Sequence, residues 1–386
     1  MIKRRVAEKL LELTHSFPVI TIEGPRQSGK TTLARMTFPD YAYADLEEYA
    51  TRTLAERDPR GFLLRFPAPS VIDEIQRVPQ LLNEIQAAVD ANGANGQYVL
   101  TESHQPRLKE GIAQSLAGRT ALLTLYPLSI AELADAGIRM ERDSYIFKGF
   151  LPAIYDRVQN PVDAYEGYYR TYVEHDVRQL VNITHQGRFE LFLRLLAERV
   201  GQVVNMDGLS GEVGVSATTF KEWLSVLEES FVIYRLHPYY NNFGKRFIKS
   251  PKVYFTDVGL AAHLLQIESP QQVTRDPLAG GLFENLVVME ALKAQLNHGQ
   301  PPRLYYMRDK AGVEADLVVE THRRLRLFEI KSACTTDASM ASNLQRMGRL
   351  SDTMETGSVI YSGEDWKMGD IAFTHFSETE RLMVNQ

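Results

Sequence analysis

The chain has 386 residues, of which 44% are hydrophobic and 24% charged, so disorder as the main state is excluded and two or three domains are expected. Its net charge of −6 excludes a protein that coats nucleic acid, although a local basic groove is still compatible with this total. The single cysteine, Cys334, excludes an internal disulfide and a cysteine-based zinc site. No apolar stretch approaches the roughly 18 residues of a membrane span, so we expect a cytoplasmic protein without a membrane partner.

The first part of the chain alternates strand-like and helical segments. Short apolar segments typical of strands lie at 18–22, 42–46, 70–72, 98–101 and 121–125. Helical periodicity precedes the first of them at 4–15 and recurs at 81–90. This alternation predicts an α/β domain over 1–158, with a parallel sheet covered by helices on both faces.

A long helical region follows, from about residue 161. Helical patterns occur at 164–181, 188–200, 206–213 and 218–229, and β-prone runs at 231–236 and 253–255 flank a turn-rich segment. Helices followed by a hairpin predict a helical, winged-helix domain over 159–274.

The last region reads as a small α+β domain over 275–386. One helix is expected at 282–296 and another at 340–350, and strands are expected at 303–307, 315–319, 325–330 and 358–361.

The clearest motif follows the first strand. Residues 24–31 match G-x-x-x-x-G-K-[ST], with a strand before them and a helix after them, as a P-loop requires. Backbone N–H groups at the helix N-terminus and the Lys30 ammonium would bind phosphates, and Thr31 would bind Mg²⁺. The predicted ATP-binding residues are Gly24, Pro25, Arg26, Gln27, Ser28, Gly29, Lys30, Thr31 and Thr32.

A second motif, consisting of two acidic residues, follows the strand at 70–72. Asp73 is expected to hold the Mg²⁺ shell, and Glu74 to take the proton of the attacking water. Two surface carboxylates after a strand are the alternative interpretation.

These motifs resemble a known family. Residues 24–33, 72–76, 116–119 and 126–129 are similar to those of bacterial and archaeal AAA+-type P-loop ATPases that carry a C-terminal DUF4143 region. The similarity covers nearly the whole chain. It implies an ATP-binding core, a winged-helix segment and a C-terminal domain similar to restriction endonucleases.

The sensor segment departs from the family. This chain has Thr101-Glu102-Ser103 where the family commonly has Thr-Gly-Ser. Ser103 is the candidate sensor of the γ-phosphate, and an acid at position 102 predicts slow hydrolysis unless its side chain points away. Arg119 is a candidate charge-stabilising arginine, in cis or toward a neighbouring copy, with a structural salt bridge as the alternative.

The middle region carries a helix-turn-helix pattern in which Ser216 is the expected N-cap. Its second helix exposes Thr218, Thr219, Lys221 and Glu222. The expected wing combines the basic residues Lys245, Arg246, Lys249 and Lys252 with the aromatic residues Tyr239, Tyr240, Phe243 and Phe247. This combination suits contact with the DNA backbone, and a protein–protein role is an equal alternative.

In the third region, four residues in order resemble the PD-(D/E)XK pattern of nucleases. Glu284, Asp316 and Glu329 are the candidate ligands of a second Mg²⁺, and Lys331 would position or activate water. A salt-bridged sheet surface is the alternative.

The sequence therefore predicts a Mg-dependent ATPase that acts as a nucleotide switch on nucleic acid, with homo-oligomers as a further expectation. Two alternatives stay open: an ATP-regulated nuclease, and a non-enzymatic ATP-responsive regulator of protein interactions.

Overall fold

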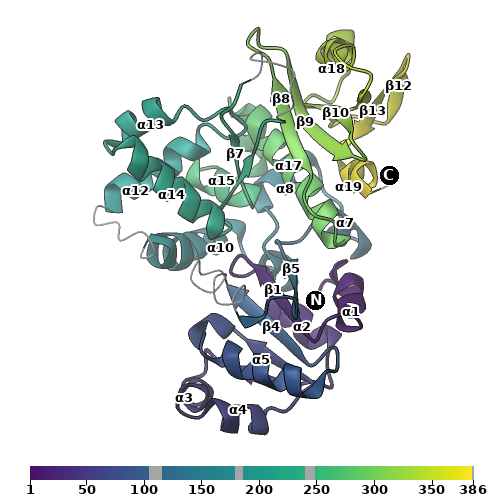
Figure 1. The fold of residues 1–386 in the computed structure, drawn as a ribbon. Helices are drawn as coiled ribbons and strands as arrows, with labels where there is room; N and C mark the ends of the chain where they lie inside the picture. Colours follow the sequence, from purple (N-terminus) through teal and green to yellow (C-terminus); the bar gives the residue numbers. More distant parts are fainter. Residues whose placement is uncertain (104–114, 179–185, 240–247, 385–386) are drawn as a thin grey trace. The chain divides into compact units, whose positions relative to one another are not determined.

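The computed structural model describes residues 1–103, 115–178, 186–239 and 248–384 (Figure 1). These residues form two compact units, the first comprising 1–128, 229–231 and 296–299 and the second comprising the rest. The regions expected as separate domains at 159–274 and 275–386 lie mostly within the second unit.

None of the helices in the described part of the chain has the length and apolar character needed to cross a membrane.

The first unit is built on a five-stranded sheet in the order β2-β3-β4-β1-β5, with every neighbouring pair parallel. Its strands are β1 (Val19–Gly24), β2 (Ala42–Asp45), β3 (Ser70–Asp73), β4 (Tyr98–Ser103) and β5 (Thr120–Thr124). Parallel pairing brings the carboxyl ends of the strands to one edge, so the residues that follow β1 and β3 meet there.

Helices cover both faces of this sheet, as predicted. They are α1 (Ala7–Thr14), α2 (Lys30–Thr37), α3 (Tyr49–Arg57), α4 (Pro59–Arg65) and α5 (Leu81–Asn92), with a short 3₁₀ turn at Ile75–Arg77. Neighbouring strand residues enter different cores: Val99 packs with residues of α1 and α2, and Leu100 with residues of α3, α4 and α5. Two faces buried in this way explain the continuous apolar runs that the strands show in the sequence.

The second unit contains the remaining α-helices and one π-helix of the described residues. They are α7 (Ile130–Asp135), α8 (Arg142–Lys148), α9 (Pro152–Asp156), α10 (Pro161–Tyr168), the π-helix η2 (Tyr169–Val177), α12 (Gln186–Ala197), α13 (Met206–Val213), α14 (Ala217–Glu229), α15 (Val258–Leu264), α16 (Pro270–Arg275), α17 (Ala279–Asn297), α18 (Ser342–Gly348) and α19 (Thr379–Val384). Of the helix expected at 164–181, the described part is an α-helix that continues as a π-helix, and residues 179–181 lie outside the described residues.

The expected order of helix, turn, helix and hairpin is present within this unit. A turn joins α13 to α14, and the Ser216 hydroxyl accepts the backbone N–H of Thr219 at 3.0 Å, as the N-cap prediction requires. Strands β6 (Ile233–Leu236) and β7 (Lys252–Phe255) then pair antiparallel. Residues 240–247, which include the predicted wing residues Tyr240, Phe243, Lys245, Arg246 and Phe247, lie outside the described residues.

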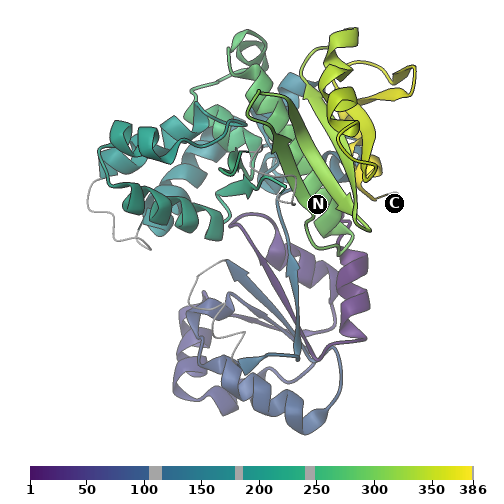
Figure 2. The same cartoon turned by 45° about the horizontal axis from the view of Figure 1, so that its top comes forward.

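A six-stranded sheet in the order β12-β13-β11-β10-β9-β8 forms the other part of the second unit (green to yellow in Figure 2). The strands are β8 (Leu304–Arg308), β9 (Glu314–Thr321), β10 (Arg324–Lys331), β11 (Met354–Tyr361), β12 (Trp366–Met368) and β13 (Ile371–His375). The strands β8, β9 and β10 are antiparallel, whereas β10, β11 and β13 run parallel. Leu344 and Met347 of α18 pack in the core on one face.

Candidate functional site

The P-loop follows β1 at the carboxyl edge of the first sheet. Gly24 has a φ of +151°, and a Cβ atom there would overlap the backbone oxygen of Leu125. Gly29, the residue before α2, has a φ of 93°. Both positions require glycine, because an L side chain rarely adopts these backbone conformations. The motif therefore lies in a tight turn against β5, directly before a helix N-terminus.

Lys30, the P-loop lysine, is buried with its ammonium folded onto the loop. Its Nζ donates to the carbonyl oxygens of Gly24 at 3.1 Å and Pro25 at 2.8 Å. Burial lowers the pKa of Lys30 to about 8, although the charges of Glu74 and Asp73 act in the opposite direction. Since burial penalises the charged form, an anion beside this ammonium would stabilise it.

Asp73 ends β3 beside the P-loop. The hydroxyl of Thr31 donates to its Oδ2 at 2.8 Å, and the hydroxyl of Tyr43 donates to the same oxygen at 2.9 Å. Thr101, on β4, donates to Oδ1. The structure thus brings Thr31 and Asp73 together as predicted, and hydroxyl and carboxylate oxygens are ligands that Mg²⁺ accepts.

Glu74 is held at the same edge by its own contacts. Ser103 Oγ donates to Glu74 Oε1 at 2.8 Å, and the Gln76 amide donates to Oε2. The backbone of Glu74 has a φ of 58°, and its N–H donates to Thr101 Oγ1 at 3.1 Å. Ser103, the predicted sensor, therefore contacts the predicted base.

Glu102 points away from this set. Successive side chains of a strand alternate between faces, so Glu102 lies on the opposite face from Thr101 and Ser103. It is fully buried, and in the sheet it is the register partner of Glu23. Its negative charge favours the charged form of Lys30. The acid in the sensor segment is therefore directed away from the Asp73 and Glu74 carboxylates.

Arg119 is not part of the site within this chain. Its guanidinium pairs with Asp90, with Nε 2.6 Å from Oδ1 and Nη2 2.9 Å from Oδ2. It precedes β5, whereas the P-loop follows the parallel strand β1, so the two lie at opposite edges of the sheet. The predicted role of Arg119 in cis is wrong, and the salt bridge is what the structure contains.

Three residues of this site were missed by sequence reasoning. Tyr43 and Thr101 both lie on strands that reach the carboxyl edge of a parallel sheet, and that position was a usable signal. Arg4 had no such signal: its buried guanidinium donates to the carbonyl oxygens of Ser28 and Tyr126, both at 2.7 Å. Arg4 thereby joins the P-loop to the segment after β5.

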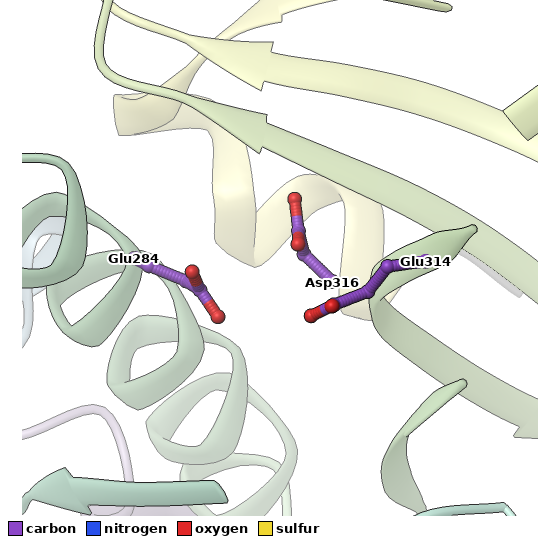
Figure 3. Close-up of side chains that lie close together, drawn as sticks. All are labelled: Glu284, Glu314 and Asp316. Atoms are coloured by element: carbon purple, nitrogen blue, oxygen red, sulfur yellow. The ribbon is translucent and has the colours of Figure 1, made fainter. Parts of the chain in front are cut away.

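A second group of acids lies in the second unit, on α17 and β9 (Figure 3). Carboxylate oxygens of Glu284, Glu314 and Asp316 lie within 4.8 Å of one another. We call these three residues the carboxylate cluster. Two of the predicted ligands, Glu284 and Asp316, belong to it, and the third member is Glu314 in place of Glu329. Alternation along β9 puts residues 314 and 316 on one face, which was a usable signal for Glu314.

Lys252 of β7 lies among these three carboxylates. Its Nζ is 2.7 Å from Glu284 Oε1, contacts Glu314 and is 3.8 Å from Asp316 Oδ1. Burial lowers the pKa of Lys252, but the attraction of the three acids outweighs burial and raises it above its usual value. The Lys252 ammonium already pairs with all three carboxylates, so the donor set does not fit a divalent cation in this arrangement. The prediction that Lys252 contacts DNA is wrong, because its side chain is 3% exposed.

Glu329 and Lys331 form an ion pair on β10 that adjoins the carboxylate cluster at Asp316. Lys331 Nζ lies 2.6 Å from Glu329 Oε1 and 3.9 Å from Asp316 Oδ2. Burial, with the nearby Asp316, raises the pKa of Glu329 to about 8. Burial likewise raises the pKa of Glu284 to about 7. Glu329 and Lys331 are joined by a salt bridge, as in the alternative interpretation, but Glu329 is buried and so does not lie on a sheet surface.

Three segments of the chain match known protein families. Residues 16–134 match a family described as an AAA domain, residues 139–271 the domain of unknown function DUF8612, and residues 279–375 the domain of unknown function DUF4143.

Related proteins and solved structures were also found. The uncharacterized protein Rv2008c of Mycobacterium tuberculosis is 31% identical over 94% of this chain and 80% of its own length. An uncharacterized protein of Haemophilus influenzae is 24% identical over 74% of this chain and 77% of its own length. The Walker-type ATPase PABY2304 of Pyrococcus abyssi has 14% identity and a TM-score of 0.45, over 67% of this chain and 94% of that chain.

The AAA and DUF4143 matches stand in the order that the motifs imply, and the mycobacterial relative extends over nearly the whole chain. The chain belongs to the family of AAA-type P-loop ATPases that carry a C-terminal DUF4143 domain.

Proposed function

We propose that the first unit binds ATP with Mg²⁺ and hydrolyses it, and that the chain uses this cycle as a nucleotide switch on nucleic acid. The observation that carries the proposal is the contact between Thr31 and Asp73 directly beside the buried Lys30. In this proposal Lys30 is the phosphate-binding cation, and Thr31 and Asp73 at the same edge of the sheet are the oxygen ligands of Mg²⁺.

Each residue has a distinct task in this proposal. Lys30 exchanges the carbonyl oxygens of Gly24 and Pro25 for phosphate oxygens, and Thr31 and Asp73 hold the metal. When bound, Mg²⁺ neutralises charge on the phosphate oxygens. Glu74, oriented by Ser103, accepts the proton of the attacking water. Because Glu102 faces away, we do not expect it to slow hydrolysis by repelling phosphate.

Two variants test the ATPase proposal. Lys30→Ala removes the phosphate-binding cation and should abolish ATP binding, measured by calorimetry. Glu74→Gln keeps the shape of the side chain and should bind ATP with near-normal affinity but hydrolyse it at least about 100-fold more slowly, in the range of a lost general base. Equal ATP affinity in Lys30→Ala and the parent chain would refute the site, and normal turnover in Glu74→Gln would refute the role of Glu74.

Action on DNA is supported by the helix-turn-helix of α13 and α14 and by the basic residues Lys245, Arg246 and Lys249 in the sequence. Thr218 and Lys221 are exposed on α14, where a recognition helix would contact DNA. ATP turnover with and without duplex DNA tests this step. If DNA stimulates ATP turnover and the double variant Thr218→Ala/Lys221→Ala loses this stimulation, action on DNA is supported. If DNA does not change ATP turnover, the alternative of a regulator of protein interactions is favoured.

Homo-oligomerisation belongs to the same proposal, with Arg119 offered to a neighbouring copy. Light scattering with and without ATP tests the assembly. Arg119→Ala should lower turnover only if Arg119 acts across an interface, because its partner within the chain is Asp90.

A further inference from the structure

The carboxylate cluster is nearly balanced in charge by side chains of this chain. Lys252 contacts all three acids. A second cation, Arg308, lies on β8 with its Nη1 3.3 Å from Glu314 Oε2. Three buried or half-buried acids would repel one another strongly without such partners. The cluster therefore needs no added ion to exist as it is.

The position of Lys252 is fixed by backbone as well as by charge. Residues on both sides of 240–247 are bonded to β8: Tyr239 N donates to Tyr306 O at 2.8 Å, and Ile248 N donates to Arg308 O at 3.0 Å. Lys252 itself begins β7 and also forms a bridge with Val203. Its side chain thus enters the cluster from a strand that is held at several points.

Tyr254, two residues further along β7, reinforces this placement. Its hydroxyl donates to Glu284 Oε1 at 2.6 Å, the oxygen that Lys252 also contacts. Residues 252 and 254 share one face of β7. Two donors of one strand therefore saturate one oxygen of Glu284.

We propose that Lys252 is the resident cation of the carboxylate cluster: it excludes divalent metal from Glu284, Glu314 and Asp316 and fastens the β6–β7 hairpin to α17 and β9. A divalent ion at this position would have to displace a buried ammonium that makes short contacts with two carboxylates. The cluster consequently acts as an ion-pair anchor, and metal-dependent cleavage at it requires that Lys252 leave.

Titration of the full chain with Mn²⁺ tests this proposal. Binding is measured as the loss of the electron paramagnetic resonance signal of the free ion. All chains carry Asp73→Asn, so that Mn²⁺ at the P-loop does not contribute. The compared chains are this parent, parent with Asp316→Asn, parent with Lys252→Met, and parent with Lys252→Met and Glu314→Gln.

We expect no Asp316-dependent binding in the parent. Lys252→Met should gain one Mn²⁺ site at least tenfold tighter than any in the parent, and adding Glu314→Gln should weaken that site at least tenfold. Circular dichroism confirms that each chain folds. If Lys252→Met does not fold, Lys252→Met with Glu284→Gln removes one charge of each sign and should gain the site with two carboxylates remaining.

Two results would overturn the proposal. One is a Mn²⁺ site in the parent that Asp316→Asn abolishes, because metal would then bind while Lys252 is present. The other is a folded Lys252→Met chain, or its substitute with Glu284→Gln, that gains no site, because the lysine would then not be what excludes the ion.

Discussion

Replacing Lys30 by methionine should make the chain without nucleotide more stable, although it removes a residue of the proposed site. The fully buried ammonium has a pKa lowered from 10.5 to about 8, chiefly by burial. The unfolded chain therefore binds more protons than the folded chain between these values, so Lys30 makes stability rise with pH across this window. At neutral pH, keeping the ammonium charged costs free energy of folding, and methionine removes that cost.

The size of the effect follows from the shift. A difference of 2.5 pKa units corresponds to a gain for Lys30→Met of about 3 kcal/mol at pH 7, falling to about 2 kcal/mol at pH 9 and to about 1 kcal/mol at pH 10. The value at pH 7 is an upper limit, because methionine also loses the contacts with Gly24 and Pro25.

Urea unfolding of both chains between pH 7 and pH 10, without nucleotide, measures the difference. The matched control is Lys3→Met, since Lys3 is an exposed lysine of the same unit and its replacement should change stability by less than about 0.5 kcal/mol. The folding cost assigned to the buried ammonium is refuted if Lys30→Met is no more stable than the parent at pH 7, or if any gain does not shrink toward pH 10.

Three further predictions concern the framework of the P-loop. Gly24→Ala should destabilise the first unit by at least about 2 kcal/mol, because the new methyl overlaps the Leu125 oxygen at a φ that alanine avoids, and a melting temperature equal to that of the parent would contradict this. Arg4→Met removes charge-assisted hydrogen bonds to loop carbonyls, each contributing about 1.5–3 kcal/mol, and should weaken ATP binding about tenfold in calorimetry, whereas Arg4→Lys should recover part of the loss. Thr101→Val keeps the shape of the side chain but removes a donor to Asp73, so turnover should fall about tenfold with little change in melting temperature; a large change in melting temperature would assign Thr101 a structural role.

The local part of the nucleotide site was predictable from the sequence. Gly24, Lys30 and Thr31 occupy neighbouring positions in one turn, and their spacing fixes their geometry. Asp73 was within reach of the same reasoning because it ends a strand, and the strands of a parallel sheet end at one edge. The five strands of the first sheet were all predicted, since burial on both faces leaves continuous apolar runs.

Contacts between distant segments were not predictable in this way. Arg4 bonds to Tyr126, 122 residues away, and nothing in the composition around either residue signals the pair. Lys252 illustrates the same difficulty, because in the sequence it continues a basic run. Only the fold shows that its side chain is buried and that it pairs with Glu284, 32 residues further along the chain. The prediction for Arg119 failed for a related reason, because the order of the motifs did not show that Arg119 directly precedes a strand and so lies at the far edge of the sheet.

Three hydroxyl groups around Asp73 connect its carboxylate to three different elements of the first unit. Thr31, Tyr43 and Thr101 reach this one carboxylate from α2, β2 and β4 respectively. Its two oxygens offer about four acceptor positions, so a metal bound there competes with hydroxyls that belong to three different elements. If the proposed function holds, metal binding at Asp73 would change hydrogen bonds on α2, β2 and β4 together, so these three elements are where a response to nucleotide would begin.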